Sequence, residues 1–172
     1  SYKGRISNIT YTDYITYVSL FAQIASGPIS RYDETDISSS SYINSEQINE
    51  AIYRISKGLF YKLVIADRLS MYTMTVMSDY SSYPSMALWM AMILFSVELY
   101  ADFAGYSEIA IGICCLFGFR VKDNFRNPYF SVSFREFWNR WHISLSTWLR
   151  DYVYIPLGGN RRGNLRKTVN VL

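Results

Sequence analysis

The chain has 172 residues, a net charge of +3 and an aromatic content of 17%. This length is enough for one domain with its own core, and the adjacent Cys114 and Cys115 exclude an ordinary disulfide between them and match no metal-ligand spacing. The mean hydropathy of +0.01 fits a soluble protein or a membrane protein, because tyrosine and tryptophan suit a membrane interface and an aromatic core alike.

The positive charge is concentrated near the C-terminus. Residues 135–172 contain seven basic and two acidic side chains, which gives +5, whereas residues 1–134 contain ten and twelve, which gives −2. A solvated tail, a cytoplasmic membrane flank and a nucleic-acid patch all agree with this asymmetry. Because the chain opens with Ser1 and stops at Leu172 in what resembles a further segment, we expect it to be a piece of a longer protein.

The first expected element is a helix that starts at Thr10 and is ended by Gly27 and Pro28. A serine-rich loop, residues 30–45, follows it. All four prolines of the chain fall at plausible element boundaries of this kind.

The second expected element is an amphipathic helix over residues 45–68. Asn44 is placed to cap it, with Gln47 three residues later as the partner in a capping box. Apolar residues recur every three or four positions, and basic residues occupy another face. Such a helix can lie on a bilayer or on a soluble core, and the pattern is the same for both. The apolar positions are Ile48, Ile52, Ile55, Leu59, Leu63 and Ala66, and the basic ones are Arg54, Lys57, Lys62 and Arg68.

Two apolar runs, residues 85–97 and 109–119, come next. Each is shorter than the roughly 20 apolar residues of a simple membrane span. Joined over residues 86–119 they could cross a membrane, but with acidic side chains inside, which normally face a polar cavity or a partner. Gly105 and Gly112 are two helical turns apart and would let another backbone approach this face closely. The acidic residues are Glu98, Asp102 and Glu108.

Residues 134–163 carry most of the side chains that could do chemistry, including His142, the only histidine. We predict one helix here, on which Ser146 shares the face of His142 and Asp151 does not. That geometry excludes a Ser–His–Asp relay built from this helix. Thr147 excludes the HxxxxD box of glycerolipid acyltransferases, and one histidine supplies too few ligands for a metal. A hydrogen-bonded structural histidine remains an alternative.

Tryptophan and arginine alternate along this helix and could stack bases and bind phosphates. A nucleic-acid surface would have to expose the apolar stripe of the helix, which we expect to be buried, so we predict no nucleic-acid partner. After the helix, residues 155–159 form a stop and turn, and the basic stretch that follows suits an exit into the cytoplasm. The stripe consists of Phe137, Trp141, Leu145, Trp148 and Leu149.

Four blocks carry a more specific pattern. Residues 27–32 read GPISRY, residues 62–67 read KLVIAD, and residues 100–112 read YADFAGYSEIAIG. The fourth block joins NFRNPY, residues 124–129, to FWNRWHISLSTWLRDYVYIPLGGN, residues 137–160. In this order they resemble the motifs of the membrane-bound O-acyltransferase (MBOAT) family. The ending IPLGGN is similar to that of its bacterial branch for polysaccharide O-acetylation of the alginate type.

The resemblance implies an all-α fold, a polytopic bundle of membrane helices around a tunnel, with interfacial and re-entrant helices, in the bacterial cytoplasmic (inner) membrane. Residues 1–172 would be the central part of a single domain, with N-terminal spans and a C-terminal part outside them. The implied reaction moves an acetyl or other acyl group from a thioester to a hydroxyl of a cell-surface polysaccharide, with a histidine as base. A dry tunnel protects the thioester from water.

The resemblance also implies the partners and the site. The donor would be acetyl-CoA or an acyl-carrier thioester, with no bound cofactor or metal, and the partners would be membrane lipid, the donor and the polysaccharide or a periplasmic transferase. His142 matches the first of two family histidines and would line the tunnel or assist. The main catalytic histidine is expected beyond Leu172, so the piece alone would be inactive. The implied substrate-binding positions are Asn139, Arg140, Trp141, Ser146 and Asp151, with Asp102 and Tyr106 fixing the tunnel helices.

Two alternatives stay open. One is D-alanyl transfer from a carrier protein to teichoic acid, by a branch that shares the DFAGYS and NRWH blocks but usually lacks IPLGGN. The other is a non-catalytic membrane scaffold that passes acyl groups to a separate periplasmic transferase.

Overall fold

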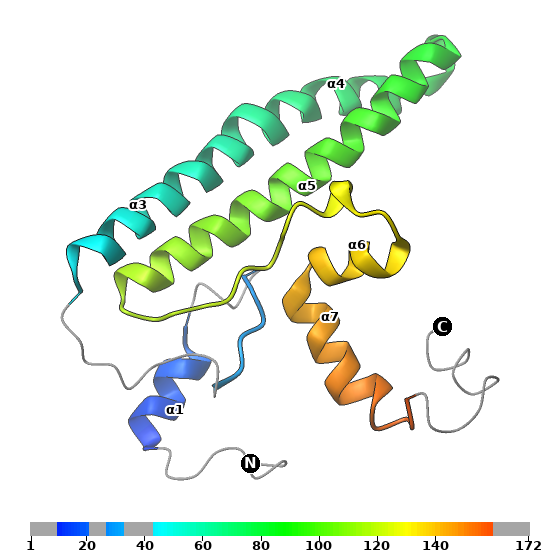
Figure 1. Cartoon of the computed structure of the whole chain (residues 1–172). Helices are drawn as coiled ribbons and strands as arrows, with labels where there is room; N and C mark the ends of the chain where they lie inside the picture. The colour runs from blue at the N-terminus through cyan, green and yellow to red at the C-terminus, as the bar shows by residue number, and fades with distance from the viewer. Residues whose placement is uncertain (1–9, 21–26, 33–42, 160–172) are drawn as a thin grey trace. The chain divides into compact units, whose positions relative to one another are not determined.

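The computed structural model describes residues 10–20, 27–32 and 43–159. Every regular element within these ranges is a helix, which confirms the all-α class predicted from the sequence. The chain divides into two units, Ser1–Val121 and Lys122–Leu172, which are coloured blue to green and yellow to orange in Figure 1.

The first unit begins with α1, Tyr11–Val18. The prediction of one helix up to Gly27 is wrong, because the chain turns at Ser19 and buries Leu20 in the core of the unit. Residues 21–26 of the predicted helix lie outside the described residues. The Tyr17 hydroxyl also donates a hydrogen bond of 2.6 Å to the carbonyl oxygen of Ser30, which ties the GPISRY block to α1.

A continuous helical run follows, made of α3 (Ser45–Leu59), the π-helix η2 (Phe60–Ala66) and α4 (Asp67–Ser78). The predicted capping box is confirmed. The Asn44 side chain accepts from the Gln47 N–H at 2.8 Å, and the Gln47 side chain accepts from the Asn44 N–H at 3.0 Å. The predicted helix over residues 45–68 is therefore correct but too short. The wide π-helical turns in its middle, a feature often found at functional sites, were not predicted.

Helix α5, Ser85–Leu116, joins the two apolar runs into one element of 32 residues. Within the described ranges it is the one helix whose length and composition would allow it to cross a membrane. Its C-terminus is closed by two hydrogen bonds, from Gly118 to Cys115 at 3.0 Å and from Phe119 to Cys114 at 2.9 Å. Gly118 has a φ of +80°, a left-handed conformation that glycine adopts without steric cost.

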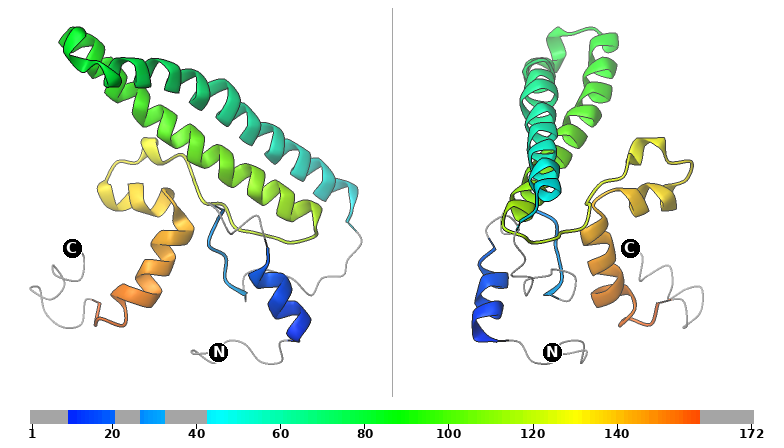
Figure 2. Two further views of the ribbon diagram at one scale, coloured as in Figure 1. Left: turned by 180° about the vertical axis from the view of Figure 1, so that it is seen from behind. Right: turned by 60° about the vertical axis from the view of Figure 1, so that its left-hand side comes forward.

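The helical run α3–η2–α4 and helix α5 form a long antiparallel hairpin, seen side by side from every direction in Figures 1 and 2. Small residues allow this close packing. A Cβ added at Gly58 would lie 2.5 Å from the carbonyl oxygen of Gly105, and one added at Gly112 would lie 2.9 Å from the carbonyl oxygen of Ala51. The prediction that Gly105 and Gly112 permit a close backbone approach is confirmed.

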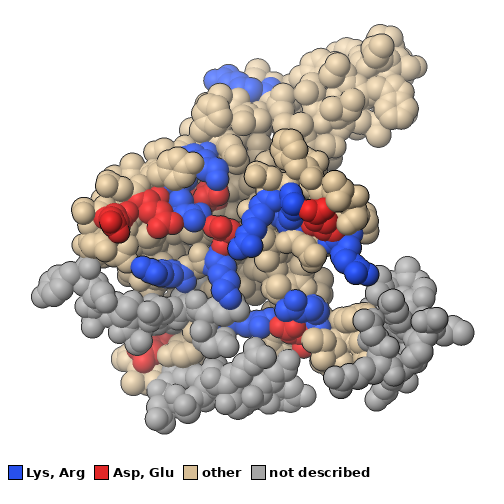
Figure 3. All heavy atoms as spheres, viewed as in Figure 1, with Lys and Arg blue, Asp and Glu red and all other residues tan. Residues whose placement is uncertain are grey.

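Many large apolar side chains of the hairpin point away from this interface, although Ile55 and Ile109 lie against its glycines. Ile52 and Leu63 are 56% and 53% exposed, whereas Ala51, Gly58 and Ala66 of the same helical run are buried. Between Arg68 and Glu98 the sequence contains a single charged residue, Asp79. Figure 3 accordingly shows uncharged side chains over the end of the hairpin near the α4–α5 connection. The outer surface of the hairpin therefore has the composition expected of a surface in contact with lipid or further apolar helices.

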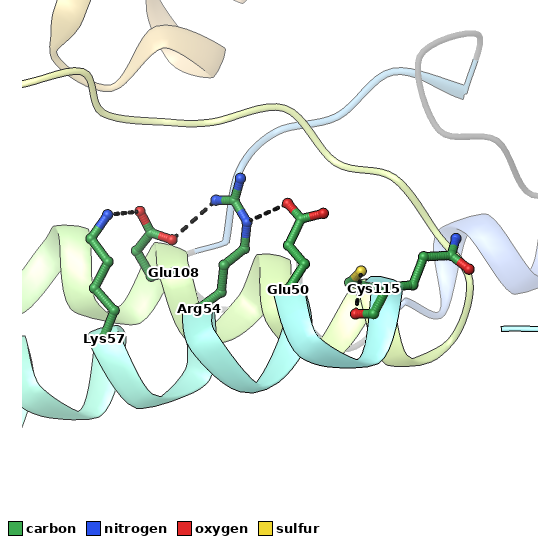
Figure 4. Close-up of polar contacts among 6 residues, drawn as sticks. Glu50, Arg54, Lys57, Glu108 and Cys115 are labelled. Carbon is green, nitrogen blue, oxygen red and sulfur yellow. Dashed lines mark hydrogen bonds and ion pairs between the residues drawn. The ribbon is translucent and has the colours of Figure 1, made fainter. Parts of the chain in front are cut away.

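The acidic residues of α5 meet partners on the opposite helix, as expected for acidic side chains within a joined apolar segment. Glu108 accepts from Arg54 at 3.0 Å and from Lys57 at 2.8 Å, and Arg54 also reaches Glu50 at 3.0 Å (Figure 4). The Glu108 side chain is only 15% exposed. Glu108 therefore joins two basic side chains of α3 to α5 in a partly buried group of ion pairs.

Two further side chains of the helical run, Lys62 and Thr73, contact acidic residues of α5. Lys62 bonds Asp102 of α5 at 2.7 Å, and the Thr73 hydroxyl donates to the Glu98 carboxylate. Lys62 also bonds Asp67 of its own helical run at 2.9 Å. The hairpin therefore combines a small-residue interface with a row of polar contacts, and both fix the register of its helices.

The second unit contains the 3₁₀ turn η4 (Pro128–Phe130), α6 (Phe134–Arg140), α7 (Ile143–Leu149) and the π-helix η5 (Arg150–Tyr154). The prediction of one continuous helix is wrong, because α6 and α7 are separated by a break (Figure 1). The predicted stop and turn at residues 155–159 is confirmed, with Gly158 and Gly159 at positive φ.

Candidate functional site

The break between α6 and α7 is made by hydrogen bonds from a segment far away in the sequence. The N–H of Arg126 donates to the carbonyl oxygen of Arg140, and the N–H of Ile143 donates to the carbonyl oxygen of Asn124, each at 2.9 Å. A continuous helix would use these groups internally. Here the Arg140 carbonyl and the Ile143 N–H bond to residues 124–126 instead, and the chain changes direction at His142.

His142 itself occupies a left-handed backbone conformation, with φ 44° and ψ 54°. A non-glycine residue in this region costs on the order of 1–3 kcal/mol and persists only where the surroundings enforce it. Such positions are frequent at functional sites. Because His142 precedes α7 and is not within a helix, the predicted shared face of His142 and Ser146 is wrong.

Asn124 is the centre of the polar contacts around His142. Its side chain is buried, and its Oδ1 accepts from the Ser144 N–H at 3.2 Å and from the Ser144 hydroxyl at 2.9 Å. The same oxygen lies 3.2 Å from Nδ1 of His142. The Ser144 hydroxyl is also 3.4 Å from this nitrogen. An amide and a hydroxyl therefore surround Nδ1.

Aromatic rings cover the other side of the break. The Trp141 ring meets Phe125 edge-on at 5.1 Å and stacks on Phe137 at 5.5 Å, and Phe125 stacks on the imidazole of His142 at 6.5 Å. Tyr129 packs on Phe137 at 6.4 Å. This half-buried setting lowers the pKa of His142 below its usual value, because burial disfavours the charged imidazolium. His142 is therefore mostly neutral near neutral pH.

The apolar stripe expected along one helix is not buried as a unit. Phe137, Trp141 and Leu145 are partly buried, whereas Trp148 and Leu149 are 39% and 45% exposed. The break turns α7 away from the direction of α6, so the regular spacing of these residues does not place them on one surface.

The other site residues expected in this unit hold different positions. The Arg140 side chain donates to Glu136 one turn back, and the Ser146 hydroxyl donates to the carbonyl oxygen of Trp141 at 3.3 Å. Asp151 is buried and accepts from Arg150 at 2.9 Å. Asn139 is exposed on α6. The structure therefore gathers Trp141, His142 and Ser146 at the break and places Asp151 further along, in η5.

Asp102 and Tyr106 belong to α5 in the first unit. Asp102 is held by Lys62, which comes from the KLVIAD block, so two of the family-like blocks meet in this ion pair. Tyr106 is 38% exposed.

Two residues of the site, Asn124 and Ser144, were not predicted from the sequence. Asn124 opens the NFRNPY block, which was a signal of its importance, but nothing local links it to a histidine 18 residues later. Ser144 was missed because a continuous helix would have placed Ser146, and not Ser144, beside His142.

The arrangement holds one imidazole in a fixed orientation beside an amide and a hydroxyl. A neutral, oriented imidazole in a partly dry aromatic setting can accept a hydrogen bond or a proton from an attacking hydroxyl. In the described part of the chain, no group of three or more His, Cys, Asp or Glu side chains is arranged to hold a metal ion.

Comparison with known proteins places these features in a family. The sequence model of the MBOAT, membrane-bound O-acyltransferase, family matches residues 1–172. The protein of Pseudomonas fluorescens named "Probable alginate O-acetylase AlgI" is 40% identical over 158 residues, which are 89% of this chain and 31% of that protein.

Two further relatives are named for other activities. The peptidoglycan O-acetyltransferase of Helicobacter pylori is 38% identical over 155 residues, covering 88% of this chain and 29% of that protein. The teichoic acid D-alanyltransferase of Bacillus subtilis is 32% identical over 143 residues, covering 81% of this chain and 36% of that protein. The chain thus spans about a third of the length of the curated relatives it matches.

Proposed function

Because this chain belongs to the membrane-bound O-acyltransferase family, we propose that the full-length protein transfers an acetyl group from a thioester to a hydroxyl of a cell-surface polysaccharide. The observation that carries the proposal is the half-buried, neutral His142, held in a left-handed conformation within the FWNRWHISLSTWLRDYVYIPLGGN block. Strained backbone conformations and perturbed pKa values are both frequent at functional sites, which supports a functional role for this histidine.

The choice of an acetyl group rests on the relatives. The two compared here that are named for O-acetylation are 40% and 38% identical to the chain, against 32% for the D-alanyltransferase. The IPLGGN ending of the chain supports the same branch. Acetyl-CoA or an acetyl group on a carrier thioester would be the donor.

We further propose that residues 1–172 form the central part of one domain that crosses the bacterial inner membrane several times around a tunnel. The 32-residue apolar helix α5, the apolar outer surface of the hairpin and the pairing of its acidic residues support this placement. Further spans and a second histidine would lie in the rest of the protein. His142 would line the tunnel and assist, while the second histidine would be the main base.

In the proposed reaction, a hydroxyl oxygen of the polysaccharide attacks the thioester carbonyl, an ester forms and the thiol leaves. The hydroxyl proton passes to a histidine and then to the departing sulfur. His142 would orient the hydroxyl by accepting its hydrogen bond. Asn139, Arg140, Trp141, Ser146 and Asp151 would shape the binding site around it, and Asp102 and Tyr106 would hold the tunnel helices.

D-alanyl transfer to teichoic acid is the second candidate, because a D-alanyltransferase aligns with 81% of the chain. It would use the same histidine and a carrier protein as donor. The third possibility, a scaffold that passes acyl groups to a separate transferase, would need the site for binding and not for chemistry.

Deletion of the gene for the full-length protein is expected to remove one ester-linked acyl species from the surface polysaccharides, and a plasmid copy should restore it. The measurement is mild alkaline release of esters followed by mass spectrometry. Loss of acetate supports the proposal, whereas loss of D-alanine selects the second candidate. An unchanged ester profile in the deletion strain would contradict acyl transfer to this surface.

A further inference from the structure

The orientation of the Asn124 side-chain amide is determined by the backbone. The N–H of Ser144 points at this amide at 3.2 Å, and a backbone N–H can only donate. The amide atom that faces it must therefore be the oxygen, because an NH₂ group in that place would set two donors against each other. The Ser144 hydroxyl donates to the same oxygen at 2.9 Å, in agreement with this orientation.

This orientation determines which nitrogen of His142 carries the proton. Nδ1 lies 3.2 Å from the Asn124 oxygen, which can only accept. An unprotonated Nδ1 would set two lone pairs against each other, whereas Nδ1–H makes a hydrogen bond. The Ser144 hydroxyl could instead donate to Nδ1 at 3.4 Å, but its bond to Asn124 is shorter by 0.5 Å. In the neutral imidazole, Nε2 then holds the lone pair.

We infer that Asn124 is a positioning residue that holds neutral His142 in the Nδ1–H tautomer, so that Nε2 is the nitrogen presented to the hydroxyl of the acyl acceptor. This role rests on the proposed function, because the hydroxyl belongs to that reaction. The tautomer itself does not depend on which acyl group moves.

Asn124 acts on His142 through two separate atoms. Its backbone carbonyl accepts from the Ile143 N–H at 2.9 Å and helps to maintain the break before α7. Its side-chain oxygen faces Nδ1. A substitution removes the side-chain contacts, to His142 and to Ser144, and leaves the backbone hydrogen bond available, so a change in tautomer can be observed. This separation makes Asn124 a suitable position for a test.

The test uses the full-length protein in detergent or nanodiscs, with ¹⁵N-labelled histidine and NMR at a pH well above the imidazole pKa. The His142 signals are assigned by their absence in His142→Gln. The wild type is expected to show a protonated Nδ1 and an unprotonated Nε2. Asn124→Ala should shift the population toward Nε2–H, the tautomer favoured in water, and lower acyl transfer on the order of 10- to 100-fold, as for partners that orient metal-binding histidines.

Asn124→Asp is the matched variant, because a carboxylate also only accepts and should keep the Nδ1–H tautomer and more of the transfer activity than Asn124→Ala. If the alanine variant fails to accumulate, the tautomer and the transfer activity of Asn124→Asp are measured in its place. A wild type with Nε2–H, or an alanine variant that keeps Nδ1–H and full activity, overturns the inference. A wild type with Nδ1–H that transfers no acyl group would refute the proposed function and still support the orientation of His142 by Asn124.

Discussion

Replacing His142 with asparagine in the full-length protein is expected to lower the ester-linked acyl content of surface polysaccharides by about 100-fold or more. In the proposed reaction His142 orients the attacking hydroxyl, and the loss of such positioning can cost about 100-fold in rate. Asparagine tolerates the left-handed backbone that His142 adopts at φ 44°. The substitution therefore removes the imidazole and keeps the backbone of the break between α6 and α7.

The His142→Gly variant is the companion control, because glycine fits the same backbone without strain and offers no side chain. Both variants should accumulate in the membrane like the wild type and both should lose the ester. Esters are released with mild alkali and quantified by mass spectrometry at matched protein abundance. Full ester content in His142→Asn would make His142 a structural residue with no part in orienting the acceptor hydroxyl.

Replacing Gly58 with alanine is expected to destabilise the protein by about 1–3 kcal/mol, the usual cost of overpacking. Helix propensity alone predicts the opposite sign, since alanine is favoured over glycine in a helix by about 1 kcal/mol. The packing effect should win, because the new Cβ would lie 2.5 Å from the carbonyl oxygen of Gly105 and 2.9 Å from the backbone nitrogen of Ile109. Neither backbone atom can move without separating α3 from α5.

Ser56→Ala is the matched control on the same helix, because Ser56 is exposed and receives the same new residue. It should be neutral or slightly stabilising by propensity. The measurement is thermal unfolding of the full-length protein in detergent, compared with the membrane abundance of each variant. A Gly58→Ala protein that unfolds at a higher temperature than the wild type would contradict the close packing of the hairpin.

Local signals account for the parts of the fold that were predicted correctly. The capping box of Asn44 and Gln47 depends on residues three apart, so its pattern is complete in the sequence. The spacing of Gly105 and Gly112 likewise marks one face of one helix. Such features need no knowledge of distant segments.

Long-range contacts account for the errors. The break before His142 arises because residues 124–126 form hydrogen bonds with the backbone of Arg140 and Ile143. The sequence of residues 134–154 alone contains no pattern that predicts these hydrogen bonds. The exposed positions of Ile52 and Leu63 were left open by the sequence, because their spacing is the same for a helix on a bilayer and for a helix on a soluble core. Exposed large apolar side chains are expected in a membrane, because lipid solvates them.

The site roles of His142 and Trp141 stay predictions. His142 was selected as the only histidine of the sequence, and the structure packs the neighbouring Trp141 against Phe137. Asn124, which orients the imidazole, could not be assigned this task from the sequence because the contact joins two segments 18 residues apart.

The most direct test of the account uses purified full-length protein in vesicles, supplied with a ¹³C-labelled acetyl thioester and the surface polysaccharide. The labelled acetyl group is then sought as an alkali-labile ester on the polysaccharide. The account predicts labelled ester with the wild type and a loss of about 100-fold or more with His142→Asn, because the hydroxyl is then no longer oriented. Labelled ester that forms only after a separate transferase is added would contradict direct transfer and identify the protein as a scaffold that passes acyl groups onward.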